Sequence, residues 1–172
     1  LTSQEDQTLT WLLEQLNLPL EFRSYVDAEV AELRLLTDIG KGKLPSYAVP
    51  PNLGLRAGEI LHYQGAAQFN QERRRRGALV SDVHLGTLTI TDTRLIFSSS
   101  TKSVALNHRS VVQHHLDRSC VEIRPTSKPS MVFDLGEKNQ LAYAIYATAV
   151  GRANQTITEV VDGAPTRHIP RD

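Results

Sequence analysis

The chain has 172 residues, of which 40% are apolar and 22% charged, a composition typical of globular proteins and not of disordered ones. Its 19 basic and 19 acidic side chains cancel, so contact with nucleic acid or a membrane would need a local patch of charge. The single cysteine, Cys120, excludes an intramolecular disulfide and suits a reducing compartment, so we expect a cytoplasmic protein.

The first 43 residues carry two helical patterns that predict a small helical hairpin. Thr2 and Glu5 have capping-box spacing, and Ser24 can cap a second helix that Gly40 and Gly42 would end. The expected buried stripes are Leu9, Leu12, Leu13 and Leu16 in the first helix, and Val26, Val30, Leu33 and Leu36 in the second. Such short helices are marginal alone, so we expect this annex to pack on the domain that comes after it.

Residues 44–58 are rich in proline and glycine and indicate a linker. From residue 59 to 135 the apolar period changes to two, which predicts roughly seven half-buried antiparallel strands separated by turns. The expected core positions of this run include Leu88, Ile90, Leu95, Phe97, Val104, Leu106, Val121, Ile123, Met131 and Phe133. We expect Gly65 to mark a bulge or bend in a long first strand.

After the last strand, residues 137–150 have helical spacing, with Gly151 as the expected stop. The face predicted to be buried comprises Leu141, Ala144, Ile145, Thr148 and Ala149. Residues 153–172 are expected to form a polar tail. The expected fold is α+β: a helical hairpin, then a seven-stranded antiparallel β-barrel over residues 59–152 whose open mouth the last helix caps.

The hairpin Gly-Thr-Leu-Thr-Ile-Thr-Asp-Thr-Arg-Leu-Ile-Phe, residues 86–97, resembles the strand-turn-strand signature of GRAM domains and related bacterial domains of the pleckstrin-homology superfold. The likeness covers about residues 55–152. It implies a scaffold whose members bind phosphoinositide head groups, other acidic lipids or protein segments. The matching residues build turns and core, so they indicate the fold and not a ligand.

Four consecutive arginines, Arg73, Arg74, Arg75 and Arg76, stand between the first and second predicted strands. Guanidinium groups bind phosphate or carboxylate in bidentate fashion. The resemblance implies that this loop holds head-group phosphates in lipid-binding members of the superfold. A solvated loop is the alternative that we favour, because the next strand offers Ser81, Asp82 and His84 in place of further bases.

No residue pattern points to catalysis or a cofactor. His114 and His115 are adjacent on a predicted strand and face opposite ways, so only one of them could join His108, and no metal-binding motif supports such a site. Cys120 lacks a nucleophile signature. Aromatic residues make up only 6% of the chain, which disfavours nucleic-acid binding through the arginines.

We therefore expect a non-enzymatic adaptor for recruitment or protein-protein assembly, without metal or cofactor. The alternatives are peripheral membrane binding or nucleic-acid contact through the four arginines. Because the chain begins at Leu1 and ends in a polar stretch, we expect it to be a segment of a longer intracellular protein. The longest apolar run, residues 141–150, is shorter than the roughly 20 residues that a membrane-spanning helix needs.

Overall fold

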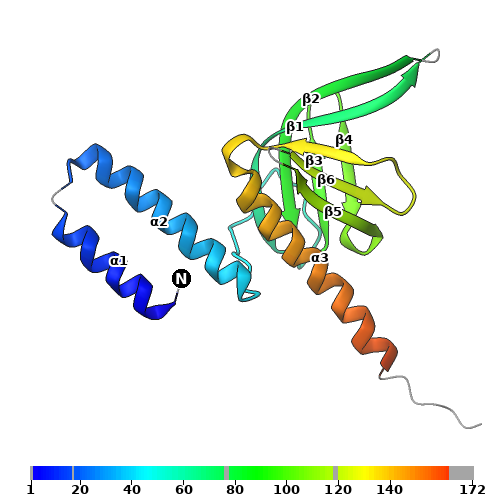
Figure 1. The fold of residues 1–172 in the computed structure, drawn as a ribbon. Coiled ribbons are helices and arrows are strands. Elements are labelled where there is room, and N and C mark those ends of the chain that lie inside the picture. Colours follow the sequence, from blue (N-terminus) through cyan, green and yellow to red (C-terminus); the bar gives the residue numbers. More distant parts are fainter. Residues whose placement is uncertain (1, 17, 76–77, 118–119, 163–172) are drawn as a thin grey trace, which may run out of the picture. The chain divides into compact units, whose positions relative to one another are not determined.

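The computed structural model describes residues 2–16, 18–75, 78–117 and 120–162. The chain divides into two compact units, Leu1–Pro45 and Ser46–Asp172, and the division falls inside the predicted linker. Figure 1 shows a helical hairpin in the first unit and a curved sheet with one long helix in the second. In the described residues no helix is both long enough and apolar enough to cross a membrane.

The first unit consists of α1 (Ser3–Gln15) and α2 (Leu20–Gly40). The predicted capping box is present: Thr2 Oγ1 accepts from Glu5 N at 3.2 Å, and the Glu5 carboxylate accepts from Thr2 N at 2.7 Å. These hydrogen bonds lower the pKa of Glu5 below its ordinary value. Arg34 on α2 donates to Asp6 at 2.6 Å and to Thr10 at 2.9 Å, which joins the two helices.

Three predictions about this hairpin were wrong, and one of them is the burial of Leu33 on the second helix, because that side chain is exposed. Helix α2 begins directly after Pro19, since proline has no N–H to leave unsatisfied there, and Ser24 lies inside the helix with its hydroxyl on the Leu20 carbonyl at 3.0 Å. The stripe of α1 is only partly covered: Leu12 and Leu16 are exposed. The contacts to Arg34 turn the Asp6 and Thr10 side of α1 toward α2 instead.

The second unit holds seven antiparallel strands in one sheet of order β4-β3-β2-β1-β7-β6-β5. The strands are β1 (Leu61–Arg75), β2 (Ala78–Thr91), β3 (Arg94–Ser98), β4 (Ser103–Asn107), β5 (Val111–Asp117), β6 (Cys120–Pro125) and β7 (Met131–Asp134). The 3₁₀ turn η1 (His108–Ser110) joins β4 to β5, and η2 (Gly136–Lys138) leads into α3 (Asn139–Asp162). Element order and strand number agree with the predicted α+β fold.

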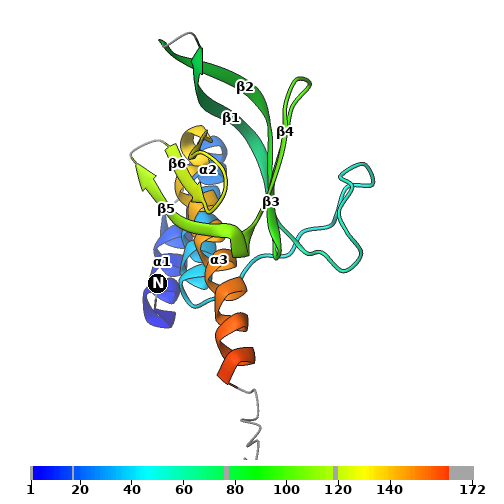
Figure 2. The same ribbon diagram turned by 90° about the vertical axis from the view of Figure 1, so that its right-hand side faces the viewer.

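The sheet is open, which corrects the prediction of a barrel. In the described residues the edge strand β4 pairs only with β3, and the edge strand β5 pairs only with β6. The two edges do not pair with each other, because η1 redirects the chain between β4 and β5. Figure 2 shows the resulting two halves with α3 between them. The register irregularity of β1 lies between Leu61 and Tyr63 and not at Gly65, which pairs regularly with Leu88.

The core lies between the curved sheet and α3. Phe69, Phe97 and Phe133 come from three strands, and their ring centroids are 5.1 to 6.0 Å apart. Gly86 packs closely on the facing strand: a Cβ there would lie 2.3 Å from the Ser98 carbonyl oxygen. This contact explains why the strand pair β2–β3 needs glycine at that position.

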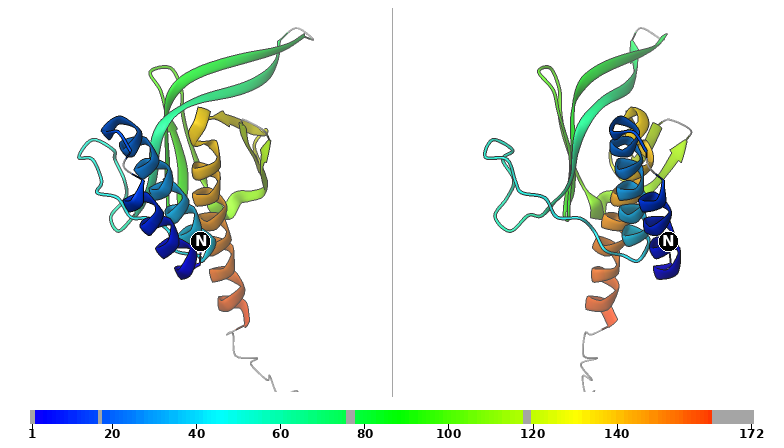
Figure 3. Two further views of the ribbon diagram at one scale, coloured as in Figure 1. Left: turned by 60° about the vertical axis from the view of Figure 1, so that its left-hand side comes forward. Right: turned by 90° about the vertical axis from the view of Figure 1, so that its left-hand side faces the viewer.

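Helix α3 packs on η1 and on both halves of the sheet, as Figure 3 also shows. Its buried face consists of Ala142, Ile145, Tyr146, Ala149 and Val150, so Leu141, Ala144 and Thr148 are less covered than predicted. The helix also passes through Gly151, where a stop was expected. A glycine inside a helix costs only about 1 kcal/mol relative to alanine, and Gly151 does not take the positive φ of a terminating glycine.

Candidate functional site

Of the four arginines singled out by the sequence, the three that the structure describes lie at the far end of β1 in the long β1–β2 hairpin, which Figure 1 shows projecting from the sheet. Arg73, Arg74 and Arg75 are not in a loop but form the end of β1, where they pair with Val80, Leu79 and Ala78. Arg76 lies outside the described residues. Their assignment as a binding site therefore stays a prediction.

His114 and His115 point to opposite faces of β5, as the alternation of side chains along a strand requires. His108 on η1 and His114 on β5 both contact Tyr146 of α3, each with ring centroids 5.5 Å from that ring. His115 faces away and lies 3.4 Å from Glu122. Burial lowers the pKa of both His108 and His114. Within the described ranges, no three histidine, cysteine, aspartate or glutamate side chains meet in a metal-binding group.

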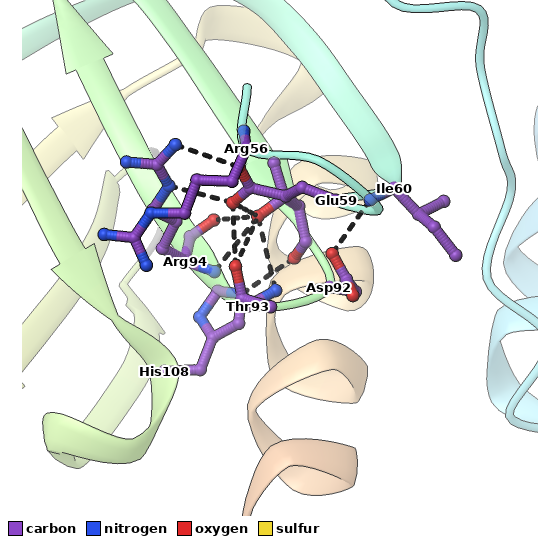
Figure 4. A network of polar contacts seen from close by, with 8 residues as sticks. Arg56, Glu59, Ile60, Asp92, Thr93, Arg94 and His108 are labelled. Carbon is purple, nitrogen blue, oxygen red and sulfur yellow. Dashed lines mark hydrogen bonds and ion pairs between the residues drawn. The ribbon is translucent and has the colours of Figure 1, made fainter. Parts of the chain in front are cut away.

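Glu59, just before β1, is a buried carboxylate that was not among the residues predicted from the sequence. Figure 4 shows hydrogen-bond donors converging on it from the β2–β3 turn. Its Oε1 accepts from Thr93 Oγ1 at 2.7 Å and from Arg94 Nε at 2.8 Å, and its Oε2 accepts from Arg94 Nη2 and the Arg56 amide, both at 2.9 Å. Burial by itself would raise the pKa of Glu59, but these hydrogen bonds outweigh it and hold the pKa well below the usual range.

This ion pair has a structural role. It fixes the segment before β1 to the β2–β3 turn, and its donors already use the acceptor capacity of the carboxylate. A general base needs free lone pairs and a pKa near the working pH, and Glu59 has neither. The one sequence signal connected with Glu59 is the Thr-x-x-Arg turn of residues 91–94, which lies beside it in space and supplies most of its hydrogen-bond donors.

One concave feature of the second unit is an apolar groove of about 580 Å³ beside the first half of β1. We call it the β1 groove. Its lining residues are Tyr47, Ala48, Leu61, Tyr63, Gln64, Gly65, Ala66, Leu135, Lys138 and Leu141. The groove thus lies between a strand and the start of α3, with one lysine in an apolar lining.

The β1 groove runs beside a stretch of strand that is paired on one side only. Strand β1 pairs with β2 over its whole length, whereas β7 covers only residues 68–70. Tyr47 forms an isolated antiparallel bridge to Leu61, with its N–H on the Leu61 carbonyl at 2.9 Å. Between them, residues 64–67 have no second strand partner among the described residues.

The floor of the groove depends on Gly65. A Cβ at this position would lie 2.4 Å from Tyr63 Oη, so the Tyr63 side chain lies along the strand over the glycine. Gln64 and Ala66, on the opposite face of the strand, are exposed. An open sheet can accept a partner's strand at such an edge, but no residue pattern in the sequence locates it.

Comparisons with known proteins do not assign a family. No family model matches the chain, and no curated protein matches it in sequence. Solved structures similar to it include the C-terminal domain of an unknown protein from Leishmania infantum, 17% identical over 55% of this chain and 86% of that chain, with a TM-score of 0.41. Another is the N-terminally truncated linker-DH/PH domains of p115-RhoGEF, 12% identical over 77% of this chain and 44% of that chain, with a TM-score of 0.40. Similarities this low assign neither fold nor function.

Proposed function

We propose that this chain is a non-enzymatic binding module of the pleckstrin-homology-like type, which serves protein-protein assembly. The sheet order and the terminal helix support the superfold. The β1 groove, with its half-paired strand, is the observation that carries the binding role.

The ligand is an extended segment of a partner protein that adds as a strand along residues 64–67 of β1. Strand addition gains main-chain hydrogen bonds, while pockets for alternate side chains provide specificity. Tyr47 already makes such a bridge to the first residue of β1, and Leu135 and Leu141 offer apolar contacts beside the edge. Lys138 at the same groove favours a segment with an acidic residue or a terminal carboxylate.

The buried titratable groups support a role without catalysis. Glu59 accepts from donors on both of its oxygens, and Tyr146 is enclosed in the core, where burial raises its pKa above the usual range. The pKa of each group is therefore shifted away from the values near neutral pH that acid-base catalysis requires.

A peptide-display selection against the whole chain tests the proposed function. Peptides that bind should shift the amide resonances of residues 63–66 and 141, and Ala66→Arg should abolish their binding, because Ala66 is exposed and lines the groove at the unpaired edge of β1. Ala105→Arg is the matched control, since Ala105 is an exposed alanine on the edge strand β4. Peptides that bind with equal affinity to A66R, or that shift only other residues, would refute the proposal.

Membrane attachment through Arg73, Arg74, Arg75 and Arg76 is the second candidate, favoured by the place of Arg73, Arg74 and Arg75 at the end of β1 in a projecting hairpin. Co-sedimentation with phosphatidylserine vesicles at low salt tests it. A change of all four arginines to serine should remove any binding, because each basic residue near an anionic surface contributes about 1 kcal/mol. Unchanged sedimentation of the serine variant would exclude the lipid role, and the same variant tests nucleic-acid contact.

A further inference from the structure

A second pocket lies in the same unit, away from the β1 groove, where the β2–β3 turn, η1 and α3 meet. Its volume is about 410 Å³, within the range of small-molecule sites. Three arginines line it, and each comes from a different element: Arg56 from the segment before β1, Arg109 from η1 and Arg152 from α3. We call it the arginine pocket.

The walls of the arginine pocket are held in place by hydrogen bonds. The Arg56 amide donates to Glu59 at 2.9 Å, and Figure 4 shows its side chain on the same side of Glu59 as Arg94. The His108 amide donates to the Thr93 carbonyl at 3.0 Å, which fixes η1 to the β2–β3 turn. Because the backbone is fixed, a ligand would have to order only side chains, which lowers the entropic cost of binding.

The charged side chains that line the arginine pocket are mostly basic. Among the described residues that line it, Asp92 is the only carboxylate, and its Oδ1 atom accepts from the Ile60 amide at 2.9 Å. Within the part of the chain that the structure describes, no ion pair engages Arg56 or Arg109. By contrast, Arg94 is neutralised by Glu59 at 2.8 Å. The lining therefore holds three guanidinium groups and one carboxylate.

Asn107 adds a neutral donor. Its Oδ1 accepts from the Arg109 amide at 3.0 Å, which leaves the amide NH₂ group as a donor at the pocket. A guanidinium fork can bind two oxygens of a phosphate group at once, and a phosphate offers more oxygens to several arginines than a carboxylate does.

We infer that the arginine pocket binds a phosphate group carried by a larger molecule. The pocket has room for more than the phosphate itself, which is consistent with a phosphorylated metabolite or a lipid head group. It is distinct from the arginines at the β1–β2 tip and from the β1 groove, so it gives the module a second ligand whose binding can be measured separately.

Calorimetry and amide NMR with inorganic pyrophosphate test this inference on the whole chain. Saturable binding should shift residues 92, 93, 107 and 109. Arg56→Gln, Arg109→Gln and Arg152→Gln should each weaken it about tenfold, the loss expected for one charge-assisted contact. Arg124→Gln, an exposed arginine on β6, is the matched control and should leave the affinity unchanged within about twofold. The substituted arginines are exposed, so the dispersed spectrum should persist in every variant.

Two further comparisons identify the source of the phosphate and separate this inference from the proposed function. Binding of phosphatidylcholine vesicles that contain a phosphoinositide, lost in the pocket variants, would indicate a head group; pyrophosphate binding without vesicle binding would indicate a soluble compound. A66R should keep pyrophosphate affinity. The inference is overturned if pyrophosphate does not saturate at millimolar concentration, if R124Q weakens it as much as the pocket variants, or if only the serine variant of the four tip arginines removes it.

Discussion

Replacing Glu59 with glutamine tests whether the buried ion pair holds the start of β1 to the β2–β3 turn. The change keeps the size of the side chain and removes only its charge and one acceptor. Glutamine has one oxygen where Glu59 has two, so the donors that now reach the lost oxygen would face an NH₂ group. Depending on the orientation of the amide, these are Arg94 Nη2 with the Arg56 amide, or Arg94 Nε with the hydroxyl groups of Thr91 and Thr93.

The size of the effect depends on burial. Removing one partner of a buried ion pair costs about 3–5 kcal/mol, because it leaves the other charge uncompensated. The Glu59 side chain is 2% exposed but that of Arg94 is 16% exposed, so water can partly solvate the guanidinium that remains. We expect E59Q to lower the free energy of unfolding by about 3 kcal/mol, the lower end of that range. Arg94→Gln should cost more, since it leaves the less accessible charge without a partner.

Urea unfolding at pH 7 measures both variants, at a pH where the contribution of Glu59 is complete. Its folded pKa is depressed, so the contribution is present above the unfolded value of about 4.3 and is lost as the pH falls through the folded pKa. Glu122→Gln is the control: its pair with His115 is exposed and should be worth less than about 1 kcal/mol. If E59Q and E122Q cost the same, the network does not stabilise the fold. In a double-mutant cycle, E59Q with R94Q should cost less than the sum of the single changes.

Two further results are expected from packing and from the buried histidines. Gly86→Ala should lower the free energy of unfolding by about 1–3 kcal/mol, because the new Cβ would clash with the Ser98 carbonyl oxygen. Gly151→Ala should raise it by about 0.5–1 kcal/mol, because a Cβ at that helical position would have no atom within 4 Å. Thermal unfolding measures both variants, and midpoints that shift in the same direction would contradict this prediction. His108 and His114 have lowered pKa values, so the unfolded chain binds more protons and stability should fall as the pH drops below about 6.5. His108→Gln should flatten that pH dependence in urea midpoints, and an unchanged slope in H108Q would show that His108 does not titrate on unfolding.

Local patterns in the sequence were enough to predict the elements. The capping box at Thr2, the alternation along the strands and the close contact at Gly86 all depend on neighbours in the chain or on the facing strand. Errors arose where a signal had two meanings. Gly151 could stop a helix or lie within it, and Ser24 could cap α2 or donate back to its own helix. Packing or a nearby proline decided between the two conformations in each case, and the type of the residue alone does not reveal either influence.

The amino-acid sequence alone was enough to predict the α+β order, the seven strands and the identity of most core residues. Hydrophobic period and turn chemistry are local properties of the chain, so they can be recognised without the tertiary structure. Three features depend instead on packing: the sheet stays open, residues 64–67 of β1 keep an edge, and Arg56, Arg109 and Arg152 share one pocket. Those three arginines stand far apart in the chain, and only the packing of α3 and η1 against the β2–β3 turn brings their charges to one place. Four adjacent arginines are visible in a sequence, whereas a site assembled from three elements is not.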